Sequence, residues 1–256
     1  MTSLKERLRA GDLIAATWVK TPHPHVVEVL ALSGLDALAI DAEHAPFDRA
    51  AIDLAVLASK TNPIPVLVRV PSASPEAILQ ALDSGADGII APHIRSAAEA
   101  EALVRHCHHG PGGRGFAGSS RAAGYTTLGM ARTLKAARKV TVVAQIEDVD
   151  AVDDAEAIAA VPGIDAIFIG RIDLTVSLGC ESPDDPKVVA AVREICAACR
   201  KAGRAIGMFL SRPEDVPQWR EEGVSLFILS SDQDFILKGA RALAASIRGG
   251  ETPALP

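Results

Sequence analysis

The feature that most constrains the fold is a regular alternation between short apolar runs and segments with helical periodicity, repeated eight times along the chain. The apolar runs are continuous rather than alternately apolar and polar. Continuous runs are typical of parallel strands that are covered on both faces. The expected strands are residues 13–19, 36–41, 65–70, 87–92, 141–147, 165–170, 204–210 and 225–230.

Eight strand–helix units in 256 residues match the size of a (β/α)8 barrel. A doubly wound open sheet is the competing architecture, but it usually has fewer strands and a glycine-rich first turn. The first strand–helix turn here, residues 18–25, has no glycine. We therefore expect an α/β fold in which residues 1–256 form a single (β/α)8 TIM-barrel domain. A short polar helix is expected near the N-terminus, within residues 1–12.

The composition argues against nucleic-acid and membrane partners. The net charge is −6, and the sequence contains no basic run. No apolar stretch reaches the roughly 18 residues of a membrane span, and the N-terminal residues lack the apolar core of a signal peptide. A cytoplasmic protein is therefore the default expectation.

Polar side chains gather where the expected strands end, whereas strand beginnings such as Leu13, Val66 and Val142 are mostly apolar. Barrel enzymes place their active sites at the carboxyl ends of the strands. The sequence therefore predicts an active-site mouth at this rim. The residues at or just after the strand ends are Trp18, Asp41, Glu43, His44, Arg69, Pro92, Gln145, Glu147, Gly170, Asp173, Phe209, Ser211, Ser230 and Asp232.

Two carboxylates at the rim, Glu147 and Asp173, follow the fifth and sixth strands and should be neighbours in a barrel. Two close carboxylates repel each other, so one of them becomes neutral or a cation lies between them. Few oxygen ligands with open positions suit Mg²⁺ or Mn²⁺. The alternative is that each carboxylate caps the following helix or faces solvent.

Arg69 and His44 are the candidate catalytic groups. Arg69 ends a strand that is otherwise apolar, where it could bind a carboxylate or stabilise an oxyanion. The alternative for Arg69 is an internal salt bridge to Asp41 or Glu43. His44 is a natural general base near neutral pH, and a neighbouring carboxylate would orient its ring.

Seven segments make the chain resemble the HpcH/HpaI aldolase family, the metal-dependent pyruvate aldolases of the phosphoenolpyruvate/pyruvate barrel superfamily. Each segment is weak alone, but their order and spacing are specific. The resemblance runs from about residue 4 to about residue 245. The segments are IDAEHAPFD (40–48), VLVRVPS (66–72), LDSGADGIIAPHI (82–94), GGRGFAGSSRAAGY (112–125), QIED (145–148), VPGIDAIFIG (161–170) and DLTVSLG (173–179).

The resemblance implies roles for individual residues. It implies that Glu147 and Asp173 ligate a divalent metal, which a 2-oxo acid chelates, and that Arg69 faces the ketone oxygen that becomes an enolate. It also implies that His44 and Asp41 act as an acid–base dyad.

Further residues are implied to lie near the substrate. Gln145 lies close to the bound oxo acid in the family, and Trp18 and Gly170 are expected to line the same pocket. Asp83 reaches a neighbouring subunit's site in family hexamers. On the strand assignment Asp83 precedes the fourth strand, at the far rim, so only a contact between subunits could make it functional; the alternative is a carboxylate at a helix end.

One feature departs from the family pattern. The family commonly has a proline and a small residue before the metal-ligand aspartate, whereas this chain has Arg171 and Ile172. We expect both to line the substrate pocket, although Arg171 could instead point to solvent or to a neighbouring subunit. The glycine-rich loop at 110–115 is expected to lie over the active site, with Arg114 and Arg121 as candidate contacts for substrate carboxylates.

These observations predict a metal-dependent class II aldolase that cleaves or forms 4-hydroxy-2-oxo acids. Its expected partners are pyruvate or a related 2-oxo acid and an aldehyde, and its expected metal is Mg²⁺ or Mn²⁺, with Co²⁺ or Zn²⁺ as further candidates. No lysine ends an expected strand, which disfavours a Schiff-base aldolase. The alternatives are a lyase of the same superfamily, an oxaloacetate decarboxylase, or a non-catalytic barrel that binds an oxo acid. The resemblance also implies a homohexamer.

Overall fold

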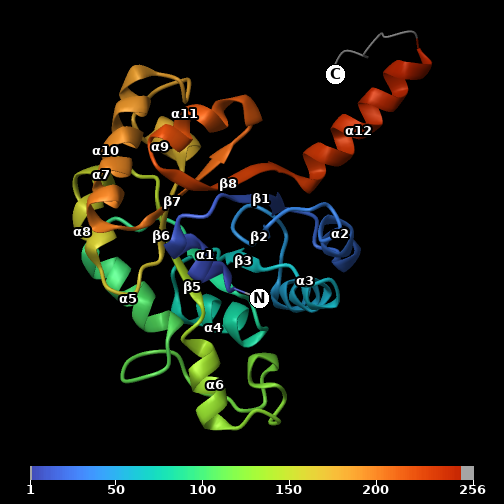
Figure 1. Ribbon diagram of the computed structural model, residues 1–256, viewed down its shortest axis with the longest axis vertical. Coiled ribbons are helices and arrows are strands. Elements are labelled where there is room, and N and C mark those ends of the chain that lie inside the picture. The colour runs from blue at the N-terminus through green and yellow to red at the C-terminus, as the bar shows by residue number, and fades with distance from the viewer. Residues whose placement is uncertain (1, 249–256) are drawn as a thin grey trace.

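The computed structural model describes residues 2–248, so residue 1 and residues 249–256 of the expected 1–256 domain lie outside the described part. Its centre is a closed barrel of parallel strands in the order β1 to β8 (Figure 1). The predicted (β/α)8 barrel is confirmed, and each expected strand end lies within one residue of the observed end. The strands are β1 (Ile14–Val19), β2 (Ala37–Asp41), β3 (Val66–Arg69), β4 (Gly88–Ala91), β5 (Thr141–Ile146), β6 (Ala166–Ile169), β7 (Ala205–Leu210) and β8 (Val224–Ser231).

Helices follow the strands around the outside of the barrel. The α-helices are α1 (Leu4–Ala10), α2 (Pro24–Leu30), α3 (Arg49–Thr61), α4 (Pro75–Asp83), α5 (Ala97–Cys107), α6 (Met130–Ala137), α7 (Asp150–Asp153), α8 (Ala155–Ala160), α9 (Arg171–Ser177), α10 (Pro186–Ala202), α11 (Val216–Glu221) and α12 (Asp232–Ile247). Two short 3₁₀ helices, η1 (Arg121–Ala123) and η2 (Pro213–Asp215), lie in loops. None of the described helices is long and apolar enough to cross a membrane.

The short N-terminal helix α1 is also confirmed. Ser3 and Glu6 form a reciprocal capping box that satisfies the first backbone N–H groups of the helix. Leu4 and Leu8 are buried in the same apolar cluster as the inward-facing strand residues. Lys5 forms an ion pair with the buried carboxylate of Asp165, at 3.0 Å. The helix therefore packs against one end of the barrel interior, and the strand ends at the opposite rim stay free to form a site.

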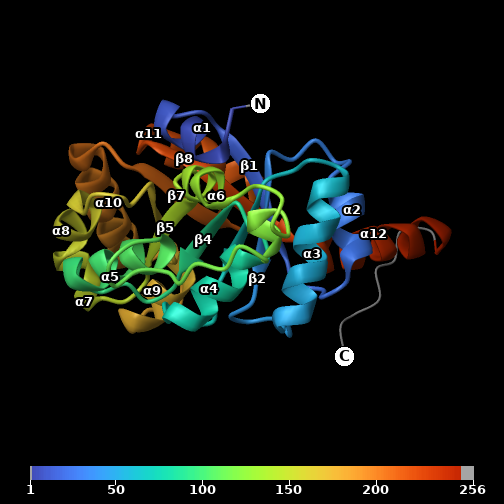
Figure 2. The same ribbon diagram turned by 90° about the horizontal axis from the view of Figure 1, so that it is seen from below.

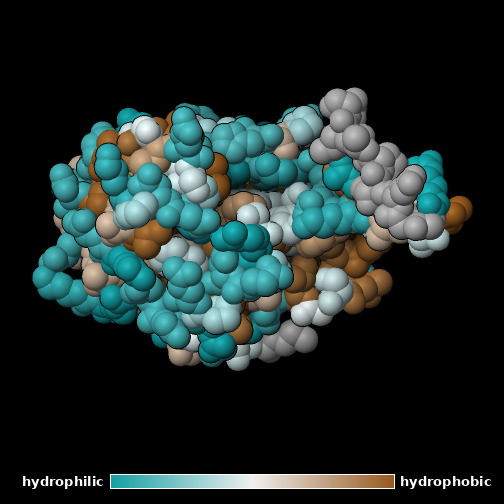
Figure 3. All heavy atoms as spheres, turned by 90° about the horizontal axis from the view of Figure 1, so that it is seen from above, coloured by the Kyte–Doolittle hydropathy of each residue, from teal (hydrophilic) through white to brown (hydrophobic). Residues whose placement is uncertain are grey.

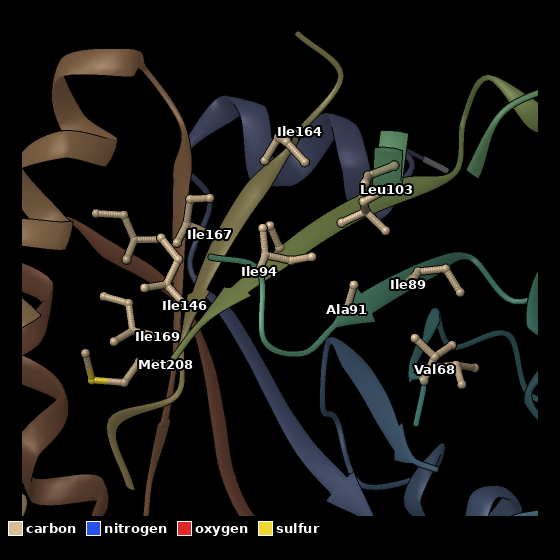
Figure 4. Packing of buried hydrophobic residues seen from close by; sticks show 14 of the residues in the cluster. Val68, Ile89, Ala91, Ile94, Leu103, Ile146, Ile164, Ile167, Ile169 and Met208 are labelled. Atoms are coloured by element: carbon tan, nitrogen blue, oxygen red, sulfur yellow. The ribbon is translucent and has the colours of Figure 1, made fainter. Parts of the chain in front are cut away.

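The core has two layers because alternate residues of each strand face opposite sides. Inward-facing side chains, including Leu67, Ile90 and Phe168, fill the barrel interior. Outward-facing side chains pack against the helices, and Figure 4 shows part of this layer, with Ile89 and Ile167 of the strands together with Leu103 of α5. Both faces of each strand are therefore apolar, which explains why the strand sequences are continuous apolar runs.

The last helix, α12, does not pack along the barrel. Figures 1 and 2 show it extending away from the strands, beyond the end that carries α2 and α3. Asp232 is its only residue that the structure describes as buried. Its exposed large apolar side chains are Phe235, Ile236, Leu237, Leu243 and Ile247.

Helix α2 and the turn after it lie at the same end of the molecule and also expose apolar side chains. Val29 is 67% exposed and Leu32 is 75% exposed, which leaves this part of the surface apolar. In Figure 3, brown atoms gather at the right-hand end of the molecule, where Figure 1 places α2 and α12.

Gly88 at the start of β4 provides a test of the barrel packing. A Cβ at this position would lie 2.5 Å from the carbonyl oxygen of Thr141 and 2.6 Å from Leu67 Cδ2, on the two neighbouring strands. We expect Gly88→Ala to lower the free energy of unfolding by about 1–3 kcal/mol, the usual cost of overpacking.

Urea unfolding followed by circular dichroism measures this change. Gly115→Ala is the matched control, because a Cβ at Gly115 meets no atom within 4 Å. The control should stay within about 0.5 kcal/mol of the wild type. Equal stabilities of the two variants would contradict the packing described for β3, β4 and β5.

Candidate active site

The carboxyl ends of the strands open onto a cavity of about 520 Å³. Most of the residues that the sequence predicts for the substrate pocket line this cavity. The predicted polar rim therefore surrounds a single cavity. The expected residues that line it are Trp18, His44, Arg69, Gln145, Gly170, Arg171, Ile172 and Asp173. Residues that were not singled out as substrate-binding also line it: Lys20, Phe168, Phe209, Ser211, Ser230, Ser231, Gln233, Asp234 and Lys238.

A buried ion pair joins the ends of β2 and β3. Asp41 and Arg69 are partners in the strand register. Arg69 Nε donates a hydrogen bond to Asp41 Oδ1 at 3.0 Å, and its terminal nitrogen lies 2.9 Å from Oδ2. Burial raises the pKa of Asp41, but the hydrogen bond and charge of Arg69 outweigh it, so the pKa lies below its ordinary value.

Two more contacts hold this pair in place. The guanidinium of Arg69 lies over the ring of Trp18, 4.3 Å from its centroid, where a cation is attracted to the ring face. Lys20 Nζ lies 3.2 Å from Asp41 Oδ2. The salt bridge that the sequence left as an alternative for Arg69 is therefore present, and Arg69 lines the cavity as well.

Lys20 was missed by the sequence reasoning. None of the described strands ends in lysine, as expected, but Lys20 comes directly after β1 and lines the cavity. The assigned strand ended at Val19, and one residue decides whether a side chain counts as part of the rim. The Lys20 ammonium forms an ion pair with the buried Asp41 carboxylate.

His44 lies at the cavity, but its ring does not contact Asp41. Its backbone N–H donates to Asp41 Oδ1 at 3.1 Å, whereas its ring Nε2 lies 3.6 Å from Glu43 Oε2. The expected pairing of His44 with Asp41 is therefore made through the backbone. The carboxylate of Asp41 is already engaged by Arg69 and Lys20, which leaves Glu43 as the carboxylate beside the imidazole.

Glu147 follows β5 and is almost completely buried. Its Oε2 accepts a hydrogen bond from the side chain of Gln145, and its Oε1 accepts one from the backbone N–H of His93 at 2.9 Å. Burial raises the pKa of Glu147 above its ordinary value, although these hydrogen bonds act in the opposite direction. Gly170 is required beside it, because a Cβ there would lie 2.5 Å from Glu147 Oε2.

Oxygen and nitrogen donors converge next to Glu147. Glu43, His93 and Glu147 each offer one donor atom, and these atoms lie within 4.8 Å of one another. Oε2 of Glu43 is buried and has no hydrogen-bond partner in the described structure, although Arg69 Nε lies 3.3 Å from it. A buried, unsatisfied carboxylate oxygen beside other donors fits a cation. Together with the family, described below, this donor group indicates a divalent metal.

Asp173, the second expected metal ligand, lies in the first turn of α9 and lines the same cavity. Its charge is close enough to raise the pKa of Glu43, whose burial is the main cause of that shift. Glu43 had been named as a rim residue and as an alternative salt-bridge partner of Arg69, but not as a metal ligand, and His93 had not been named. His93 directly follows Pro92 at the end of β4, which is the signal that could have identified it.

Arg171 lines the cavity, but its guanidinium is held by the protein. It lies 2.5 Å from Asp184 Oδ1, donates to the carbonyl oxygen of Pro183 at 2.7 Å, and sits 5.2 Å from the centroid of the Trp219 ring. Arg171 therefore fastens the loop before α10 to α9, and it points neither to solvent nor to the metal ligands. Ile172 is 49% exposed at the cavity.

The glycine-rich loop does not lie over this cavity. It follows α5, so it returns to the opposite rim of the barrel, as helix-to-strand loops do. Arg114 is buried and donates to His109, and Arg121 is paired with Asp53 of α3. The expectation that these arginines meet the substrate in the cavity of their own chain is therefore wrong.

Asp83 lies at the end of α4 in a separate cavity of about 750 Å³, and none of its lining residues borders the strand-end cavity. Arg49, Arg121 and Tyr125 also line this second cavity. Burial raises the pKa of Asp83, against the opposing charges of Arg114, His109 and Arg49. Within one chain, Asp83 and the strand-end site are therefore apart.

Comparison with known proteins identifies the family. The family described as HpcH/HpaI aldolase/citrate lyase matches residues 15–238. The chain belongs to this family. It is 34% identical to a hydroxypyruvate/pyruvate aldolase of Paraburkholderia phytofirmans, over 96% of this chain and 97% of that protein. It is 36% identical to a 4-hydroxy-2-oxovalerate aldolase of Rhodococcus jostii, over 96% of this chain and 95% of that protein.

Solved structures agree with this assignment. An HpcH/HpaI aldolase/citrate lyase family protein from Burkholderia cenocepacia superposes with a TM-score of 0.90 at 35% identity, covering 97% of this chain and 100% of that one. The citrate synthase SbnG superposes with a TM-score of 0.86 at 30% identity, covering 98% and 99%. The similar proteins therefore include ones named as aldolases and one named as a citrate synthase.

The Asp41–Arg69 pair gives a testable stability prediction. Asp41→Asn leaves the Arg69 guanidinium without its main negative partner in a buried site. We expect the free energy of unfolding to fall by about 3 kcal/mol at pH 7, the scale of breaking a buried ion pair. Because the folded-state pKa of Asp41 is lowered, its contribution is complete above the ordinary value of about 4 and is lost only as the pH falls through the folded-state pKa.

Urea unfolding of the wild type and Asp41→Asn should therefore give the same difference at pH 7 and at about pH 5. Asp53→Asn is the control, because its ion pair with Arg121 is partly exposed and should contribute less than about 1 kcal/mol. A difference for Asp41→Asn no larger than that of the control would contradict the role of the pair.

Proposed function

We propose that this protein is a metal-dependent class II aldolase that cleaves or forms 4-hydroxy-2-oxo acids, with pyruvate or a related 2-oxo acid as the enolate donor and an aldehyde as the acceptor. The observation that carries the proposal is the position of Arg69. Its guanidinium is fixed on a buried carboxylate, and it lines the cavity together with Gln145 and Asp173. The names of the most similar relatives support the same reaction class.

The metal ligands in this proposal are Glu147 and Asp173, with Mg²⁺ or Mn²⁺ as the ion. A divalent cation here would supply positive charge that polarises the oxygens of a bound 2-oxo acid. Hard oxygen donors suit these two ions. Gln145 and His93 hold Glu147 by hydrogen bonds to both of its oxygens, which fixes the direction of its remaining lone pairs.

Arg69 stabilises the negative charge that develops on the ketone oxygen when the carbon–carbon bond breaks. Stabilisation of this kind is effective when the donor is already oriented before the reaction. Asp41 and Trp18 orient the guanidinium from two sides, which limits the reorganisation that the reaction requires. The aromatic and aliphatic lining, including Phe168 and Ile172, reduces the water around it.

His44 is the proposed base for the hydroxyl of the substrate, or the acid for the alkoxide in the reverse direction. Its side chain is 52% exposed at the cavity, so it is accessible to a substrate. Glu43, at 3.6 Å from Nε2, is the carboxylate that can stabilise the charged imidazole. Asp41 acts indirectly, by holding the backbone N–H of His44 and the side chain of Arg69.

A homo-oligomer, a hexamer by resemblance to the family, is part of the proposal. Helix α12 supports it, because an amphipathic helix that buries almost none of its own residues needs another surface for its apolar side chains. Asp83 would then act across a subunit boundary, where burial in its separate cavity already raises its pKa. A cytoplasmic location remains the expectation from the sequence.

Release of pyruvate from 4-hydroxy-2-oxovalerate, coupled to lactate dehydrogenase, tests the reaction. Activity should disappear after EDTA treatment and return with Mg²⁺ or Mn²⁺. Arg69→Lys keeps the charge but loses the planar donor pair, so we expect kcat to fall about 10²-fold, the scale of losing one oxyanion donor.

Arg193→Lys is the control for the arginine variant, since Arg193 forms an ion pair with Glu222 and neither residue lines the strand-end cavity. It should leave kcat unchanged. Full activity in EDTA-treated protein would overturn the metal dependence. An effect of Arg69→Lys on KM alone would show that Arg69 binds the ground state and does not stabilise the transition state.

A further inference from the structure

We propose that Lys20 determines the acceptor specificity of the site, and that the preferred acceptor is a short aldehyde with a carboxylate next to its carbonyl group. The inference rests on the proposed function and leaves its enolate donor, metal ligands and base unchanged. Lys20 directly follows β1 and lines the strand-end cavity, and the proposed chemistry of the enolate gives it no role.

The backbone of Lys20 is fixed by a buried carboxylate. Asp232, at the start of α12, is 2% exposed. Its Oδ1 accepts a hydrogen bond from the N–H of Lys20 at 2.7 Å, and its Oδ2 accepts one from the N–H of Thr21 at 3.0 Å. These two hydrogen bonds restrict the turn after β1 and fix the direction in which the Lys20 side chain leaves it. A side chain that is oriented in advance loses less entropy when it binds a ligand.

The side chain of Lys20 lies over the rim of the barrel. It is 30% exposed, whereas lysines in folded proteins are mostly exposed. Its Nζ lies 3.2 Å from Asp41 Oδ2, and Arg69 contacts the same oxygen at 2.9 Å. An ammonium group carries three N–H donors. Asp41 Oδ2 takes one of them, so the others can reach a ligand in the cavity.

The shared oxygen of Asp41 places Lys20 beside the proposed enolate site. Arg69 binds the ketone oxygen of the 2-oxo acid in the proposed reaction, and the two cations are neighbours because they contact one oxygen. The metal ligand Glu147 follows β5, which lies opposite β1 in the closed strand order. Lys20 is therefore on the side of the cavity that remains for the acceptor. A group that it binds there lies close to the new carbon–carbon bond, next to the aldehyde carbon.

An acceptor carboxylate needs a cation in this part of the cavity, because several of the lining side chains are aromatic. Trp18, Phe168 and Phe209 are among them. A charge in such surroundings is stable only when it is paired and hydrogen-bonded. The neighbouring end of β8 adds a hydroxyl, since Ser231 lines the cavity and is the partner of Trp18 in the strand register. Lys20 and Ser231 together offer a charged and a neutral donor.

The carboxylate that lines this side of the cavity is already paired. Asp234 lies 2.7 Å from Lys238 Nζ and accepts a hydrogen bond from the side chain of Ser230. Asp234 and Lys238 therefore offset each other. Glu43, another carboxylate at this rim, does not line the cavity. Lys20 thus decides which sign of charge the acceptor side attracts.

Binding of two oxo acids to the Mg²⁺-loaded protein tests the inference without turnover. 2-Oxoglutarate and 2-oxovalerate differ in the distal group, which is a carboxylate in the first and a methyl group in the second, and neither has the hydroxyl group that cleavage requires. Titration calorimetry should show about 10-fold to 100-fold tighter binding of 2-oxoglutarate by the wild type, the scale of a hydrogen bond to a charged group. Lys20→Met keeps the length of the side chain but removes the ammonium, and should remove this preference.

The same comparison applies to cleavage, measured as pyruvate release. We expect kcat/KM for 4-hydroxy-2-oxoglutarate to exceed that for 4-hydroxy-2-oxovalerate by about tenfold or more in the wild type, and the two to be similar in Lys20→Met. Lys20→Arg keeps a cation and should retain most of the preference. Lys201→Met is the control, because Lys201 forms an exposed ion pair with Glu156 and neither residue lines the cavity. Its preference should equal that of the wild type.

An equal loss of activity on both substrates in Lys20→Met would show that Lys20 only supports Asp41, and would overturn the inference. A wild type that binds and cleaves the two kinds of substrate equally well would also overturn it. A protein that cleaves neither substrate, but whose preference for 2-oxoglutarate depends on Lys20, contradicts the aldolase proposal only. A protein that cleaves both, with a preference that Lys20→Met does not change, contradicts the Lys20 inference only.

Discussion

The buried ion pair between Asp41 and Arg69 is the interaction on which the site depends. It lies where β2 and β3 end side by side, and it holds a guanidinium at the mouth of an otherwise apolar barrel. A charge in such a place is stable only when it is paired and hydrogen-bonded. Asp41 also holds the backbone of His44 and the ammonium of Lys20. One buried carboxylate therefore holds two side chains, at the ends of β1 and β3, and the backbone that carries His44.

The barrel lowers the conformational entropy that is lost when these side chains are held together. Each strand is rigidly paired with two neighbours, and each contributes one or two residues to the same rim. The opposite rim is closed by α1, whose leucines complete the interior. Stability and chemistry are thus divided between the two ends of the strands, as in barrel enzymes generally. Gly170 shows how close the packing is, since a methyl group there would collide with Glu147.

Strand positions and the chemical character of the rim could be predicted from the sequence, because period and burial are local properties. The contacts made by long side chains could not. The sequence does not show that Arg171 turns to Asp184 and Trp219, or that the ring of His44 lies beside Glu43. Such choices depend on partners distant in the chain. His93 is a similar case, because its role depends on a backbone conformation that the residue type does not indicate.

The sequence also did not show at which rim of the barrel a segment lies after a helix. The loop with Arg114 and Arg121 contains a conspicuous glycine-rich motif, which drew attention to its composition and away from its position in the barrel order. A segment between α5 and β5 must lie at the rim opposite the strand-end cavity. The outward path of α12 is also invisible to periodicity, since an amphipathic helix has the same sequence pattern whether its apolar face meets its own barrel or another surface.

The central claim is that this rim forms and holds the enolate of pyruvate. Exchange of the methyl protons of pyruvate with deuterium oxide, followed by nuclear magnetic resonance, measures enolate formation without any knowledge of the aldehyde. The account predicts metal-dependent exchange by the wild type and its strong reduction in Arg69→Ala. Absence of exchange in the metal-loaded wild type, or an equal rate in Arg69→Ala, would contradict it.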